Sequence, residues 1–159
     1  MKMLATIIML LVLAGTISGA ESVPGSREIR TYGGVSVGTP AGLNVFLTQY
    51  VTQKAGFRIS GGFVPGRCGD VYGVQAGPVF KWKEHGNTLW EFAVFVGYAE
   101  GVPDPGCSLD PYVWRYVGGA MALKWRRLFV ELGWSAGTGS FSSPQLVVQL
   151  GLVLGRVFR

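Results

Sequence analysis

Residues 72–98 consist of YGVQAGPVFKW, KEHGNTL and WEFAVFVGY, two alternating segments around a polar turn. In the first segment apolar side chains occupy the even positions from Tyr72 to Trp82, while glycine, glutamine and lysine fill most odd ones. The second segment repeats the pattern from Trp90 to Tyr98. A period of two belongs to β-strands, whose successive side chains point to opposite faces. The stretch therefore predicts a β-hairpin with one strongly apolar face.

Turn residues divide the rest of the chain into six further segments of this kind. Soluble strands average about five or six residues, whereas strands that cross a bilayer at a tilt need about nine to eleven. The segments have the longer length, so they favour a membrane barrel. Pro78, inside a strand, predicts a local bulge. The eight predicted strands are Ile29–Gly38, Gly42–Val51, Gly56–Val64, Val71–Trp82, Thr88–Ala99, Tyr112–Lys124, Arg127–Gly137 and Pro144–Phe158.

The connections between these strands alternate in length. Longer loops are predicted at 64–70, 100–111 and 138–143, and tight turns join the strands at the opposite end. The short connection at 39–41 departs from this pattern, since it belongs to the long-loop end. Short turns at one end and longer loops at the other are typical of outer-membrane barrels.

Aromatic residues of the apolar face gather near both ends of the predicted strands. About ten residue steps separate the two groups, which at a tilt of roughly 40° gives about 25 Å, the height of the apolar band of a membrane barrel. Two interfacial girdles are therefore predicted. The short-turn girdle contains Trp82, Trp90, Trp125 and Phe158, and the long-loop girdle contains Phe63, Tyr72, Tyr98 and Trp134.

The opposite face carries glycine, alanine and serine with single charges, which suits the narrow interior of eight strands. Its charged residues must pair if they are enclosed. They form either an ion-paired core that fills the barrel, the favoured interpretation, or a gate on a narrow water path. The predicted cluster is Arg58, Lys81, Glu91, Lys124 and Glu131. The alternative to a membrane barrel is a soluble, lipocalin-like barrel with the aromatic face inside.

The N-terminus has the layout of a secretory signal: Lys2, an apolar run, and the small residues Ser18-Gly19-Ala20. We predict a signal peptide over residues 1–20, a linker over 21–28 and a barrel over 29–159. Cys68 and Cys107 then lie in neighbouring loops of an exported protein, and this predicts a disulfide, with free thiols as the alternative.

Enzymatic and metal chemistry have little support in the sequence. The one histidine of the chain, His85, lies in a tight turn at the end opposite the long loops, away from any serine and carboxylate that could form a hydrolase site there. No spacing matches a zinc or calcium motif, so no catalytic residue, metal or cofactor is predicted. The net charge of +5 is scattered, which argues against nucleic acid as a partner. A lipid-modifying enzyme and a narrow pore remain alternatives.

Three segments carry a family resemblance: GTPAGLN at 38–44, GFRISGG at 56–62 and PQLVVQLG at 144–151. Over about residues 29–159 the chain resembles small outer-membrane barrels of the OmpA-transmembrane-domain and OmpX kind. The resemblance implies an outer-membrane location, lipid contact, and a final strand whose Phe158 is recognised by the barrel-assembly machinery. Arg159 departs from that pattern, and the peptidoglycan-binding domain of full-length OmpA-like proteins is not implied.

These observations predict an all-β fold, an eight-stranded antiparallel up-and-down transmembrane β-barrel. The predicted role is structural or interactive, through an extracellular ligand bound by loops 64–70, 100–111 and 138–143.

Overall fold

The computed structural model describes residues 31–39, 41–108, 110–140 and 143–154. The predicted signal peptide, the linker 21–28 and Phe158 lie outside these ranges. The strands are β1 (Thr31–Gly38), β2 (Gly42–Tyr50), β3 (Ala55–Gly66), β4 (Gly69–His85), β5 (Thr88–Pro103), β6 (Tyr112–Trp125), β7 (Leu128–Gly139) and β8 (Gln145–Val153). No helix in the described part of the chain is long and apolar enough to span a bilayer.

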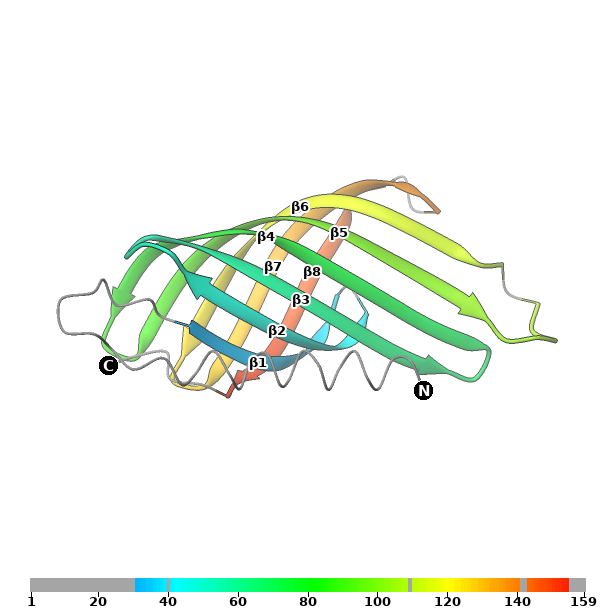
Figure 1. Cartoon of the computed structure of the whole chain (residues 1–159), viewed down its shortest axis with the longest axis horizontal. Helices are drawn as coiled ribbons and strands as arrows, with labels where there is room; N and C mark the ends of the chain where they lie inside the picture. The colour runs from blue at the N-terminus through cyan, green and yellow to red at the C-terminus, as the bar shows by residue number, and fades with distance from the viewer. Residues whose placement is uncertain (1–30, 40, 109, 141–142, 155–159) are drawn as a thin grey trace.

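The strands form a closed barrel in which each is antiparallel to the next. Pairing between β1 and β8, from Gly34↔Val153 to Gly38↔Gln149, closes the cylinder. Figure 1 shows the strands tilted in one direction, with the β4–β5 turn at one end and the β3–β4 turn at the other. The predicted fold class, an eight-stranded antiparallel up-and-down barrel, is confirmed.

β4 and β5 are longer than predicted, with 17 and 16 residues. The predicted loop 64–70 is wrong, because β3 and β4 stay paired as far as Gly66↔Gly69 and leave Arg67-Cys68 as a two-residue turn. Gly69 has a φ of 131°, a backbone conformation that residues with a side chain adopt only at an energetic cost. The loop predicted at 100–111 likewise begins only after Pro103. Hydrogen-bonded pairing between neighbouring strands therefore continues past the residues that signal a turn in the sequence.

The bulge predicted at Pro78 is also wrong. The register between β4 and β5 is the same at Ala76↔Val96 and at Val79↔Ala93, so Pro78 interrupts the pairing without shifting it. The shift occurs between Lys81 and Lys83, which makes Trp82 the extra residue. Near a strand end a bulge disrupts few ladder hydrogen bonds, and here it makes Lys83 the cross-strand partner of the outward Trp90.

The two faces of the wall have opposite chemistry, as the period of two predicts. Along β8, Leu146, Leu150 and Leu152 are about half exposed, whereas Val147 and Gln149 are buried. The interior contains both rings and polar groups, including Phe46 packed on Phe129 at 4.7 Å between ring centroids. The barrel is therefore apolar on its outside and mixed polar and aromatic on its inside.

Small residues set the distance between strands on the inner face. A Cβ atom placed on the buried Gly133 would lie 2.2 Å from the carbonyl oxygen of Gly119 and 2.5 Å from the Cβ of Ala120. At Gly61 the nearest atoms would be 3.6 Å away, an ordinary contact.

We expect Gly133→Ala to lower the free energy of unfolding by about 1–3 kcal/mol, because the added methyl group overpacks the seam between β6 and β7. Gly61→Ala is the matched control and should change it by less than about 0.5 kcal/mol. Urea unfolding of the folded chain, followed by tryptophan fluorescence, measures both. Equal effects of the two substitutions would contradict the inward placement of Gly133.

Candidate functional site

Four charged side chains from four strands meet inside the barrel. Arg58 of β3 forms ion pairs with Glu91 of β5 and Glu131 of β7, and Lys124 of β6 pairs with Glu91. These side chains are between 0 and 7% exposed. Two cations therefore face two carboxylates in an enclosed ion network, as buried charges require.

The register of β6 explains why the carboxylates converge. Ala122 is the cross-strand partner of both Glu91 and Glu131, so the two glutamates flank one small, fully buried residue. Lys124 lies two residues along β6 and therefore on the same face. The two carboxylates thus lie close enough for the guanidinium of Arg58 to pair with both.

Phenols and a hydroxyl complete the ion network. Tyr32 Oη donates to Glu91 Oε1 at 2.6 Å, and Tyr50 Oη donates to the same oxygen. Arg58 Nε donates to Thr48 Oγ1 at 3.0 Å. Tyr32, Thr48 and Tyr50 were not among the predicted site residues, although the even parity of β1 and β2 places all three inward.

Lys81 does not join the ion network. Its Nζ lies 2.6 Å from Glu84 Oε2, near the turn between β4 and β5, and 5.2 Å from the ring centroid of Tyr50. The prediction of one cluster of five charges is therefore corrected to a network of four and a separate pair near the short-turn end. Lys81 is the cross-strand partner of Glu91, but its ammonium group pairs with Glu84 near the turn.

Aromatic and amide side chains occupy the interior on the other side of the ion network. Trp114 stacks on Tyr116 at 4.1 Å between centroids, and Tyr116 Oη donates to Gln75 Oε1 at 3.2 Å. Between this group and the network lies a cavity of about 10 Å³, bordered by Arg58 and Glu131. A cavity needs a volume of about 10–15 Å³ to hold one water molecule, so this cavity has room for about one.

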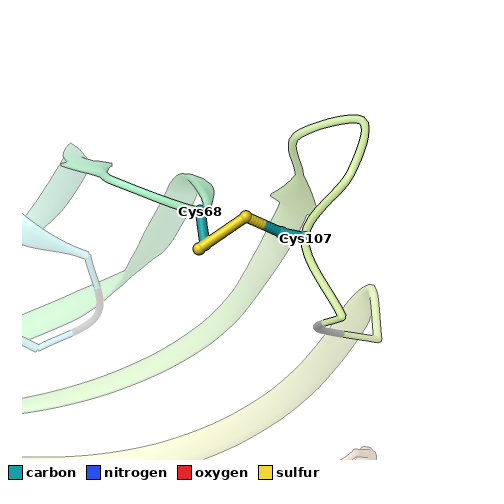
Figure 2. The surroundings of a disulfide bond; sticks show 2 residues. All are labelled: Cys68 and Cys107. Carbon is teal, nitrogen blue, oxygen red and sulfur yellow. A yellow bond between two sulfur atoms is a disulfide. The ribbon is translucent and has the colours of Figure 1, made fainter.

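A disulfide links two hairpins at the end of the barrel where β3 and β5 finish. Figure 2 shows Cys68 on the β3–β4 turn bonded to Cys107 on the connection after β5. The two Cα atoms are 5.5 Å apart, and the amide of Asp104 donates to the carbonyl of Cys68 at 3.2 Å. The structure thus joins the two cysteines that the sequence paired.

The connection after β7 is also held at this end. The amide of Ser140 donates to the carbonyl of Val113 at 3.0 Å. The Val113 amide in turn donates to Ser140 Oγ at 3.3 Å. We call the turn 66–69, residues 104–108 and 110–111 of the connection after β5, and residues 138–140 the rim.

The predicted girdle residues within the described ranges all lie on the outer parity. Trp82, Trp125 and Trp134 are more than half exposed, and the ring centroids of Phe63 and Tyr72 are 5.3 Å apart. The predicted girdle residues in the described ranges are Phe63, Tyr72, Trp82, Trp90, Tyr98, Trp125 and Trp134. Their assignment to two girdles stays a prediction.

His85 is the last residue of β4, at the end opposite the rim. Within the described ranges, no three histidine, cysteine or acidic residues gather into a group that could hold a metal ion. The features that this chain offers for function are therefore its outer wall, its ion network and its rim.

No family model matches the chain, and no curated protein is similar to it. The similar solved structures include Ail, the attachment invasion locus protein of Yersinia pestis, and Ail in complex with the heparin analogue sucrose octasulfate. Each match has 13% sequence identity and a TM-score of 0.36, and covers 79% of this chain and 91% of the other. A likeness this distant says nothing of what this chain binds.

Replacing Glu91 with alanine should lower the free energy of unfolding by about 3–5 kcal/mol, because two buried cations lose a carboxylate. Lys81→Ala, at the separate pair, should cost less than about 1 kcal/mol. Urea titration of both variants checks this. A loss below 1 kcal/mol for Glu91→Ala would show that the ion network does not stabilise the barrel.

Alkylation of the denatured chain without a reductant should add no mass, because Cys68 and Cys107 are bonded. After reduction the same treatment should add two adducts. Mass spectrometry of the whole chain measures this, and two adducts before reduction would rule out the bridge.

Proposed function

We propose that this chain is an outer-membrane β-barrel whose role is structural or interactive, through its rim, without catalysis. The observation that carries the proposal is that the apolar face of the wall points outward and the charged face inward, the reverse of a soluble barrel. Exposed large apolar side chains follow the outer parity of every strand, while Arg58, Glu91, Lys124 and Glu131 are enclosed.

Water is a poor solvent for this outer wall. Soluble monomers rarely expose a continuous apolar patch above a few hundred Å², and here such residues surround the barrel, from Val37 and Leu43 to Leu152. A soluble barrel would place these residues inside and the ion network outside. Hydrocarbon, by contrast, matches the outer wall, and a closed barrel leaves no strand edge unpaired in it.

The long hairpins support a role for the rim outside the membrane. β4 has 17 residues, whereas about nine to eleven cross a bilayer at a tilt. In β5, which has 16 residues, five follow Tyr98 on the rim side and two precede Trp90 at the other end. Asp70 and Glu100 interrupt the apolar outer parity on the rim side. The disulfide ties these projecting hairpins together, and disulfides persist in oxidising compartments. The rim is therefore a rigid surface for an extracellular ligand.

The alternation of side chains along β8 fits assembly into a membrane. Leu146, Val148, Leu150 and Leu152 all face outward on the strand that closes the barrel. We infer that the barrel-assembly machinery recognises this strand after export by the signal peptide. A pore has less support than this role, because side chains fill the interior. A lipid-modifying enzyme also has less support, because His85 lies away from the rim.

Leu150→Arg tests the membrane location. An arginine at the bilayer midplane should destabilise the inserted barrel by about 2–4 kcal/mol, whereas one near the interface costs about 0–1 kcal/mol. Val51→Arg, in the turn after β2, is the control because Val51 is also exposed and apolar. The folded fraction in phospholipid bilayers at increasing urea, read as a shift between unheated and heated samples on a gel, measures both.

A soluble barrel would tolerate both arginines equally, and the wild-type chain would show no heat-dependent shift. Either result would contradict the proposal.

A further inference from the structure

The outer wall is hollowed at the short-turn end of β5, β6 and β7. A groove of about 220 Å³ lies there. It is lined by Thr88, Trp90, Leu123, Trp125, Leu128 and Val130. A cavity of about 150 Å³ already holds a benzene molecule, so the groove has room for a segment of an acyl chain.

Positive charge borders this groove on two sides. Arg126 and Arg127 are the exposed residues between Trp125 and Leu128, which both line it. The guanidinium carbon of Arg126 lies 5.6 Å from the ring centroid of Trp125. Lys83, also exposed, is the cross-strand partner of Trp90. The groove is thus apolar along its length and cationic at its mouth.

The turn that carries the two arginines is fixed in place. The amide of Arg126 donates to the carbonyl of Asn87 at 2.9 Å, and the carbonyl of Arg127 accepts from the amide of Val153 at 2.7 Å. Neighbouring hairpins therefore hold the turn from both sides. Little freedom of the backbone would be lost when a ligand binds.

Arg126 also occupies an unfavourable backbone conformation. Its φ is 55°, and among the described residues it is the non-glycine residue with a positive φ. The turn after β4 has the same φ of 55° at the corresponding position, where the residue is Gly86. The same φ in both turns indicates that the two-residue turn requires this conformation, and in the turn after β6 the residue that adopts it carries a charge beside the groove.

We propose that this groove binds one anionic phospholipid, with an acyl chain along Trp90 and Trp125 and the phosphate on Arg126 and Arg127. The inference rests on the proposed function, which puts this end of the wall in the leaflet on the short-turn side. Indole rings favour the headgroup level of a bilayer, and guanidinium groups bind phosphate through paired hydrogen bonds. A second copy of this chain would bring the same positive charges together, so charge complementarity favours the lipid.

Native mass spectrometry of the full chain in detergent micelles tests the site. Phosphatidylglycerol and phosphatidylcholine with identical acyl chains are the probes. We expect one phosphatidylglycerol per barrel, bound at least about fivefold more tightly than phosphatidylcholine, since each basic residue at a membrane surface contributes about this factor. The double variant Arg126→Gln/Arg127→Gln should lower this preference at least about fivefold.

Two controls separate charge from shape. Lys54→Gln removes an exposed charge from the turn between β2 and β3, at the same end of the barrel, and should keep the preference. Trp125→Ala should weaken the binding of both lipids to a similar degree. Trp82→Ala, outside the groove, should leave the binding of both unchanged.

Equal binding of the two lipids by the wild-type chain would overturn the inference, as would an unchanged preference in the double variant. A dimer whose formation Trp125→Ala abolishes would also overturn it. In each case a heat-dependent gel shift would leave the proposed membrane barrel standing, whereas its absence would overturn the proposed function itself.

Discussion

The pairing of charges inside a narrow, closed wall is the constraint on which the rest of this structure depends. Glu91 and Glu131 flank Ala122 in one row, so a single guanidinium, that of Arg58, reaches both. Lys124 supplies the second cation. A slip of one residue in any of these strands would turn its charge onto the apolar outer face. The ion network therefore fixes the register as well as filling the interior.

The outer wall follows from the same register. Once alternate residues are committed to the interior, the remaining ones form a continuous apolar surface that needs a lipid solvent. The two ends of the barrel differ in structure. At the rim the hairpins extend beyond the apolar band and are tied by Cys68 and Cys107, while at the short-turn end Arg126 and Arg127 stand beside an apolar groove.

The sequence predicts what repeats along a strand and misses what depends on its neighbours. Alternation along the eight predicted strands predicted the barrel, its outward faces and all four charges of the ion network, and it wrongly added Lys81 to them. The contribution of Tyr32 and Tyr50 needs the position of β1 and β2 relative to β5, which no local pattern contains. The continuation of β3 and β4 to Gly66↔Gly69 is likewise a result of pairing, since Pro65 and Gly66 alone indicate a loop.

The most direct test of the central claim, that the apolar face of this wall contacts lipid, is the accessibility of single spin labels along β8 in phospholipid bilayers. Labels at Leu146, Val148, Leu150 and Leu152 should be accessible to oxygen dissolved in the bilayer and shielded from a water-soluble nickel complex. A label at Val147 should be shielded from the dissolved oxygen. Access of the nickel complex to all four outward positions would contradict a membrane barrel.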